Sequence, residues 1–370
     1  MTPSPTGTPS GRVHAIDALR GFDMFWIIGG GTVIERTLTL IGAPFTLALA
    51  RQFEHSKWNG FTFEDLIYPL FLFIVGLTIP FSVTKRIERG DSRRSIVLHI
   101  IRRTLILFFL GLVYNGLLDF NLVEMRWMGV LQRIALCYLA AALIFVYSGV
   151  RGRAVWTAAL LVGYWAVMVL VPAPGFGAGV LTPEGNLASY LDRLLLPGKF
   201  CCFGFGENEG ILSTFPSIAS SLIGALCADW LRTSRSGREK TLGLSCAGVA
   251  SLAAGLLWGF AFPINKLIWT SSYTLFAAGW SMLLLAAFYW IIDVRGWRTW
   301  AFFFTIIGLN PITIYIAQDL FNFGAVANIF IHGFVAYLGG FRPAFVALCV
   351  LGVKWLFLWF LYRQRIFLKI

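Results

Sequence analysis

Long apolar stretches, separated by short charged loops, recur along the whole chain and restrict its fold to that of a membrane protein. Inside a bilayer every backbone N–H and C=O group needs an internal partner, so only helices and closed barrels span the hydrocarbon. About twenty apolar residues match the length of a spanning helix, whereas barrel strands are short and alternate in polarity. The sequence therefore predicts an all-α, polytopic membrane protein with about ten transmembrane helices.

The last two predicted spans contain residues that are unusual at membrane depth. The ten spans are expected at residues 21–41, 66–82, 97–118, 128–148, 154–172, 211–231, 241–262, 271–292, 300–321 and 344–362. A shorter apolar segment, 325–338, is expected to be re-entrant or interfacial. Pro311 is expected to kink the ninth span and to free a carbonyl. Lys354 lies near the middle of the tenth, where a charge needs a partner, and we predict a structural pair with Asp319.

Composition and charge exclude two other classes of protein. Hydrophobic residues make up 58% of the chain and charged residues only 13%, which a soluble core cannot accommodate. The net charge of +12 is also found in nucleic-acid-binding proteins, but the basic residues lie in short loops between apolar stretches. Orientation in the membrane explains that placement, so no nucleic-acid partner is predicted. The six cysteines lack the spacing of metal ligands, and no metal is predicted.

Basic residues are concentrated in alternate loops, which predicts how the chain is oriented. Arg12 and the segments 85–94, 151–153, 232–240, 295–298 and 363–369 hold most of them. The positive-inside rule therefore places both termini in the cytoplasm and His55 on the outer side. The long loop 173–210 would lie outside as well, where it is expected to cover a site.

One domain is predicted, preceded by a short tail. Residues 1–11 are rich in Pro, Ser, Thr and Gly and lack an apolar signal core, so they are expected to form a flexible cytoplasmic tail. No linker or shift in composition divides residues 12–370, which we interpret as a single transmembrane domain.

A polar segment, residues 54–66, leads directly into the second predicted span. Thr62 and Asp65 have the spacing of a capping box, with Asp in place of the usual Glu or Gln, so they are predicted to be a structural cap. His55 precedes this cap in a loop at the outer mouth. Two interpretations of His55 stand at this point: a hydrogen-bonded interfacial histidine, or a functional residue beside Trp58 and Asn59, which can stack on and hydrogen-bond a ligand.

Two further polar clusters lie at the predicted inner side. Asp17, Arg20 and Asp23 share one helical face, where Arg20 either forms a structural ion pair with one of the two carboxylates or helps to hold an anionic cofactor. Arg102 and Arg103 lie just inside the third span and either face a polar cavity or extend to the lipid headgroups. On the outer side, polar residues flank the turn between the third and fourth spans: Asn115, Asp119, Arg126, Gln132 and Arg133.

Seven motifs, in order along nearly the whole chain, resemble those of the family of heparan-alpha-glucosaminide N-acetyltransferase and its bacterial relatives. They are RVHAIDALRG at 12–21, HSKWNG at 55–60, DLIYP at 65–69, GVLQRI at 129–134, EGILST at 209–214, NKLIWTSSY at 265–273 and YRQRIFLKI at 362–370. The resemblance implies a multi-pass acetyltransferase, here of the bacterial cytoplasmic (inner) membrane. It would move acetyl from cytoplasmic acetyl-CoA to a glucosamine-type amine on the other side, and the family's active histidine matches His55.

Given this expected reaction, the chemistry of the two substrates suggests roles for the polar clusters, because a charged nucleotide cannot cross hydrocarbon and has to stay near basic groups at the inner side. His55 would act as a general base or would carry the acetyl group itself. The nucleotide of acetyl-CoA would bind near Asp17, Arg20, Arg102 and Arg103. Residues expected to bind the acceptor or polarise the thioester carbonyl are Trp58, Asn59, Asp119, Gln132, Arg133 and Glu209.

Two alternatives stay open beside this function: O-acylation of an envelope glycan, and transport of a sugar or lipid. A transporter would concentrate polar groups at the midplane, whereas the polar residues here cluster at the two mouths. Membrane lipids are expected partners, and a homo-oligomer is compatible with the sequence.

Overall fold

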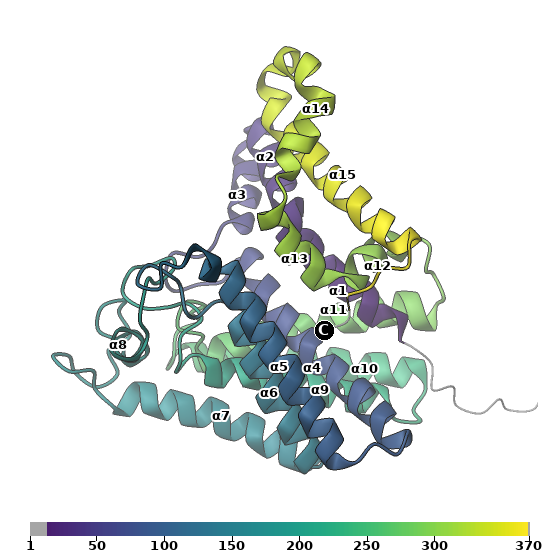
Figure 1. Ribbon diagram of the computed structural model, residues 1–370. Coiled ribbons are helices and arrows are strands. Elements are labelled where there is room, and N and C mark those ends of the chain that lie inside the picture. Colours follow the sequence, from purple (N-terminus) through teal and green to yellow (C-terminus); the bar gives the residue numbers. More distant parts are fainter. Residues whose placement is uncertain (1–12, 369–370) are drawn as a thin grey trace, which may run out of the picture.

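Helices account for all the regular structure of residues 13–368, the part of the chain that the computed structural model describes (Figure 1). Within that range no strand forms, and the one pairing of extended residues is an isolated bridge between Arg126 and Gly198. The all-α prediction is confirmed. The predicted tail, residues 1–11, lies outside the described residues.

The α-helices are α1 (His14–Phe25), α2 (Gly31–Ile41), α3 (Pro44–Ala50), α4 (Glu64–Glu88), α5 (Arg93–Tyr114), α6 (Val130–Tyr147), α7 (Val150–Leu170), α8 (Leu187–Leu195), α9 (Thr214–Leu231), α10 (Gly237–Gly259), α11 (Ser271–Tyr289), α12 (Ala301–Leu309), α13 (Pro311–Leu320), α14 (Phe323–Val335) and α15 (Arg342–Arg363). Short π or 3₁₀ turns are η1 (Trp26–Gly30), η2 (Arg51–Phe53), η3 (Leu117–Asp119), η4 (Trp290–Val294) and η5 (Ala336–Phe341).

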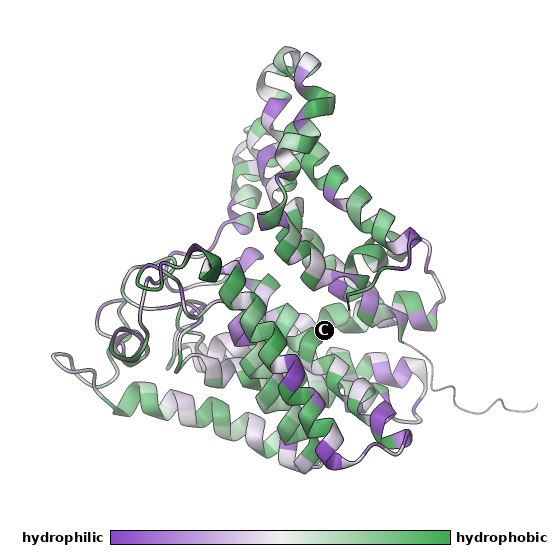
Figure 2. Ribbon diagram, viewed as in Figure 1, coloured by the Kyte–Doolittle hydropathy of each residue, from purple (hydrophilic) through white to green (hydrophobic). Residues whose placement is uncertain are grey.

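Nine helical segments of the described chain are long and apolar enough to cross a membrane, and the bent pair α12 and α13 makes up to ten. This agrees with the prediction of about ten spans. Figure 2 shows hydrophobic residues along most of α7 and α15, while hydrophilic residues gather at helix ends and in loops. The chain is therefore an all-α polytopic membrane protein.

The predicted kink at Pro311 is confirmed. Helices α12 and α13 meet at Asn310 with a bend of 71°, because proline lacks the N–H that would continue the helix. The carbonyl of Gly308, just before the bend, accepts a hydrogen bond of 3.2 Å from the Arg20 guanidinium. A basic side chain from α1 thus satisfies a carbonyl at the break.

A second break interrupts the first span at Gly29, and it corrects the predicted partner of Lys354. Gly29 has φ of 128° and lies in the π turn η1, between α1 and α2. Lys354 Nζ donates to the carbonyl of Ile28 at 2.8 Å and to Gln318 Oε1 at 3.2 Å. Lys354 therefore has partners at membrane depth, but the predicted direct pair with Asp319 does not form among the described residues. A broken helix offers the ammonium a free carbonyl instead.

Gly29→Ala is expected to destabilise the protein by about 1–3 kcal/mol, because a side chain strongly disfavours this positive φ. No atom lies within 4 Å of a Cβ added at Gly29, so the cost would be conformational rather than steric. Thermal unfolding in detergent measures it. Gly163→Ala is the matched control: Gly163 lies in α7, also has open space around it, and should gain roughly 0.5–1 kcal/mol. Equal effects of the two substitutions would contradict the assignment.

The short apolar segment predicted at 325–338 forms α14, which folds back on α15 after a turn at Gly339. Ring pairs Phe334–Phe345 and Phe323–Phe357 lie 5.4 and 5.7 Å apart. Because these pairs run in opposite chain directions, the two helices form an antiparallel hairpin at the top of Figure 1. With 13 residues α14 is about 20 Å long, shorter than the hydrocarbon core.

Helix α4 positions the residues of interest because it is held closely by α9. A Cβ on Gly76 would lie 1.8 Å from the carbonyl oxygen of Ser221, and one on Gly224 would lie 2.0 Å from that of Phe73. Small residues allow such close backbone approach in membrane bundles. Ser221 Oγ also donates to the carbonyl of Leu72 at 3.0 Å. The first turn of α4 therefore belongs to a helix that packs closely against α9.

Candidate active site

His55 and Asp65, ten residues apart in the chain, meet at the start of α4. His55 Nδ1 lies 3.0 Å from Asp65 Oδ1. Asp65 is fully buried, while 57% of the His55 side chain is exposed. A buried carboxylate thus contacts an imidazole that is itself more than half exposed.

The second carboxylate oxygen of Asp65 organises the loop that carries His55. Oδ2 accepts hydrogen bonds from the backbone N–H groups of Ser56 and Thr62, at 3.2 and 3.1 Å, and from the Thr62 hydroxyl at 3.1 Å. The predicted capping box is half formed, because Asp65 receives the Thr62 N–H but the Thr62 hydroxyl does not accept from Asp65. Asp65 therefore both caps the loop and holds His55, a second contact that the sequence analysis did not predict.

This geometry favours one protonation pattern of His55. A carboxylate oxygen only accepts, so we assign the proton to Nδ1, which leaves Nε2 as the acceptor atom of the ring, with Lys266 Nζ 3.3 Å away. The same arrangement of carboxylate and imidazole orients the base in hydrolytic triads. His55 can therefore accept a proton, or attack a carbonyl carbon, through Nε2.

Lys266 completes the cluster from the loop between α10 and α11. Its Nζ lies 2.9 Å from His55 Nδ1, 3.3 Å from Nε2, and 3.5 Å from Asp65 Oδ1. The sequence analysis noted the motif at 265–273 but gave Lys266 no role. The available signal was that Lys266 is one of few basic residues in the loops predicted to lie outside, as His55 does.

Three bonds fix the Lys266 loop against the His55 loop. Asn265 Nδ2 donates to Asn59 Oδ1 at 3.1 Å, and the Gly60 N–H donates to the carbonyl of Ile264 at 2.9 Å. From the next helix, Tyr273 donates its hydroxyl to the carbonyl of Asp65 at 2.7 Å. Asn59, predicted to bind a ligand, is thereby engaged in joining the loops.

Burial lowers the pKa of Lys266, and the negative charges of Asp65, Glu209 and Glu64 oppose that shift only in part. Only 13% of the side chain is exposed. The unfolded chain then binds a proton at pH values where the folded chain does not, so stability rises with pH in that window.

Lys266→Met is expected to remove this dependence. As the pH falls from about 10, the ordinary value for lysine, through the lowered pKa of Lys266, the melting temperature of the wild type should decline relative to the variant. Melting curves of both proteins at several pH values test it. Lys57→Met, at an exposed lysine of the same loop as His55, is the control that should follow the wild type. A pH-independent difference between wild type and Lys266→Met would contradict the expectation.

The long loop between α7 and α9 packs against the His55 loop through Trp58. Trp58 Nε1 donates to the carbonyl of Leu181 at 3.0 Å, and its ring lies 5.5 Å from that of Phe203. Cys201 and Cys202, next to Phe203, form a disulfide. Trp58 therefore anchors the covering loop.

Glu209 belongs to a charged cluster centred on Arg126. The guanidinium contacts both Glu207 and Glu209, with Nε 3.0 Å from Glu207 Oε2. Burial opposes the charge on Arg126, but the two carboxylates outweigh it and raise its pKa. Burial raises the pKa of Glu207, against the influence of Arg126. Because Glu209 also acts on Lys266 through its charge, this cluster borders the His55 site.

Arg133 and Gln132 lie fully buried on the first turn of α6. Arg133 donates to the carbonyl of Gly210 at 3.3 Å and to the Ser213 hydroxyl, and its guanidinium lies 5.0 Å from the Trp269 ring centre. Two of its nitrogens, and both polar atoms of the Gln132 amide, have no hydrogen-bond partner among the described residues. Buried donors of this kind favour an anionic or carbonyl group.

The other predicted residues lie apart from His55. Arg20 pairs with Asp17 at 3.2 Å, Arg103 lies over the ring of Tyr138 at 4.5 Å, and Arg102 is exposed. Arg20 contacts α12, whereas Arg103 contacts α6. Asp119 is exposed in η3.

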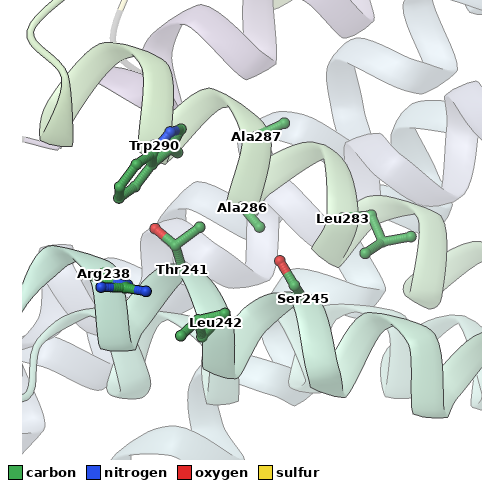
Figure 3. Close-up of a pocket in the computed structure, with 8 residues that line it drawn as sticks. All are labelled: Arg238, Thr241, Leu242, Ser245, Leu283, Ala286, Ala287 and Trp290. Carbon is green, nitrogen blue, oxygen red and sulfur yellow. The ribbon is translucent and has the colours of Figure 1, made fainter.

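Two cavities accompany these residues. One, of about 410 Å³, is lined by Trp26, Ile27, Gly31, Thr32, Glu35, Phe53, Glu54 and Glu64. It adjoins the site, since Glu54 and Glu64 are chain neighbours of His55 and Asp65. The other, of about 340 Å³, lies between α10 and α11, where Arg238 and Trp290 flank apolar residues (Figure 3). Its lining contains none of the residues described above.

Three matches relate the chain to known sequences: one family model and two relatives. Residues 12–171 match a family model described as a domain of unknown function (DUF5009). Heparan-alpha-glucosaminide N-acetyltransferase of Homo sapiens is 28% identical over 329 residues, which cover 73% of this chain and 49% of that protein. The protein of the same name from Mus musculus is 27% identical, covering 72% and 49%. The chain thus spans about half the length of the curated relatives it matches.

Proposed function

Because the chain is a relative of heparan-alpha-glucosaminide N-acetyltransferase, we propose that it is a transmembrane acetyltransferase. In this proposal it moves acetyl from cytoplasmic acetyl-CoA to the amine of a glucosamine-type sugar on the outer side of a bacterial inner membrane. The observation that carries the proposal is the largely exposed imidazole of His55, held by the buried carboxylate of Asp65.

The chemistry requires a base at the acceptor amine. The amine nitrogen attacks the thioester carbon, a C–N bond forms, and the C–S bond breaks to release the coenzyme A thiolate. His55 Nε2 accepts the proton that the amine loses, and the Asp65 carboxylate stabilises the resulting imidazolium. The proton then passes to the thiolate or to solvent.

A second route uses the same atom of His55. Nε2 attacks the thioester first, and the acetyl-imidazole then transfers its acetyl group to the amine. Incubation with acetyl-labelled acetyl-CoA, without acceptor, distinguishes the routes. Label bound to His55 supports the acetyl-enzyme, and its absence on a competent protein supports direct transfer.

Further groups are proposed to bind the two substrates. The nucleotide of acetyl-CoA, which is polyanionic, would stay at the end of the bundle where the basic loops gather, near Asp17, Arg20, Arg102 and Arg103. Arg133 and Gln132, with buried donors that lack protein partners, would polarise the thioester carbonyl. Glu209, and with it Asp119, Trp58 and Asn59, would shape the acceptor side.

A transfer assay with purified protein in lipid vesicles tests the function. Acetyl-CoA is offered with glucosamine, a muropeptide, or a sugar that carries only hydroxyl groups. We expect coenzyme A release coupled to acetylation of the amine. Acetylation of the hydroxyl-only sugar would instead indicate an O-acyltransferase, and sugar movement without consumption of acetyl-CoA would indicate a transporter.

A further inference from the structure

The cavity of about 410 Å³ beside the His55 site has a lining suited to one kind of ligand group. Three carboxylates, from Glu35 on α2, Glu54 in the His55 loop and Glu64 at the start of α4, contribute to its wall. None of the described residues that line it is basic. A cation is therefore the group that this wall would stabilise best.

Aromatic rings form another part of the wall. Trp26 and Phe53 both line the cavity, with ring centres 5.7 Å apart, and Phe63 supports them at 4.8 Å from Trp26. Indole and phenyl faces attract organic cations, and they give a flat surface to an amphipathic ring. Aromatic faces combined with carboxylates fit an ammonium group attached to a carbon skeleton better than a bare metal ion, which prefers oxygen ligands alone.

A fully buried carboxyl group lies one helical turn before two residues of this wall, Trp26 and Ile27. Asp23 is 0% exposed, and neither of its carboxylate oxygens has a hydrogen-bond partner among the described residues. It shares the helical face of Trp26 and Ile27, one turn earlier, and Glu64 is the charged group that acts on it. The Trp26 Nε1 atom is likewise buried without a partner. Trp26 itself lines the cavity, so its unpartnered N–H favours a ligand that carries a hydrogen-bond acceptor, such as a sugar hydroxyl.

We propose that this cavity binds the protonated amino group of the acceptor, with Glu64 and Glu54 contacting the ammonium and Trp26 covering the sugar ring. The inference rests on the proposed acetyl transfer and adds to it a binding site for the acceptor before its deprotonation. Glu54 precedes His55 in the chain and Glu64 precedes Asp65, so the ammonium is held next to His55. His55 takes one proton to free the amine lone pair and passes it to solvent, and then takes the second proton that the amine loses on attack. The cavity selects amines over hydroxyl-only sugars by charge.

Binding of glucosamine to the full-length protein tests the proposal without turnover. Glucosamine, N-acetylglucosamine and glucose are compared by saturation-transfer NMR or calorimetry in detergent. The wild type should bind glucosamine at least about tenfold more tightly than either neutral sugar. Glu64→Gln should weaken glucosamine binding by about 10- to 100-fold, the range for loss of a hydrogen bond to a charged group.

Kinetic measurements on the same variant distinguish a role of Glu64 in binding the acceptor from a role in folding. Glu64→Gln should raise KM for glucosamine and leave KM for acetyl-CoA unchanged. Glu88→Gln, at the opposite end of α4, is the matched control and should match the wild type in both measurements. Glu54→Gln serves as the second variant if Glu64→Gln fails to fold.

The outcomes distinguish this inference from the proposed function. Equal affinity for glucosamine and glucose, or unaltered binding in folded Glu64→Gln and Glu54→Gln, would overturn the cavity assignment. Loss of glucosamine binding on addition of a divalent cation, with recovery of binding when EDTA removes the cation, would also overturn it and indicate a metal site. Specific glucosamine binding without any acetyl transfer by the wild type would support the cavity but refute the acetyltransferase.

Discussion

Substitution of His55 by alanine is expected to abolish measurable acetyl transfer, a loss of at least about 10²- to 10⁴-fold in kcat. Either proposed route passes through Nε2 of this imidazole, and His55 is the one histidine of the described residues that pairs with a carboxylate. The fold should survive, because more than half of the His55 side chain is exposed and its truncation removes little packing. Initial rates of coenzyme A release with glucosamine measure the effect.

Two controls separate loss of chemistry from loss of structure. His55→Ala should melt within a few degrees of the wild type and should still bind acetyl-CoA. His332→Ala, at an exposed histidine of α14, should keep normal activity. Full activity in His55→Ala would exclude both routes, whereas partial recovery on adding imidazole would support the base.

The features of the fold that were predicted correctly are those that follow from the thickness of the hydrocarbon core and from local residue chemistry. Apolar stretches predicted the spans, and Pro311 predicted the bend between α12 and α13. Helix ends were less accurate: the second span was expected at 66–82, whereas α4 runs from Glu64 to Glu88. Its last turns carry Lys85 and Arg86, which belong to a helix that continues beyond the apolar stretch. Hydropathy measures the membrane-embedded part of a helix, not its full length.

The break at Gly29 was not predicted, because its cause lies far away in the chain. Glycine tolerates a positive φ but does not require one, and the sequence around η1 is apolar and helical in character. What accompanies the break is Lys354, whose ammonium binds the carbonyl of Ile28 across 326 positions. The sequence analysis gave this lysine a local charged partner, since a free backbone carbonyl is invisible without the kink.

The candidate site was predicted only in part, because its contacts also join residues that are far apart in the chain. Loop charges placed His55 at one end of the bundle, and the resemblance gave it a role. The contact with Asp65 spans a loop of nine residues, whose path follows from bonds made by Asp65 Oδ2 rather than from helical spacing. Lys266 is 211 positions away, and tertiary contacts bring it to the imidazole: the bond of Tyr273 to the Asp65 carbonyl and the two bonds between the loops.

Asp65→Asn is expected to lower kcat by about 10²- to 10⁴-fold while leaving the fold largely intact. The amide oxygen can still accept from the N–H groups of Ser56 and Thr62, so the cap is kept. The amide NH₂ then faces His55 Nδ1, which must become an acceptor. The proton moves to Nε2, and the atom that should take the amine's proton no longer has a free lone pair.

Thr62→Val tests the cap without this tautomer effect, because it removes only the hydroxyl bonds to Asp65 and Glu54. It should cost roughly 1 kcal/mol of stability and change kcat by no more than a few-fold. The double variant His55→Ala/Asp65→Asn should be no slower than His55→Ala, since Asp65 acts on catalysis only through the imidazole. Additive losses in kcat would show instead that Asp65 contacts the reacting groups independently of His55.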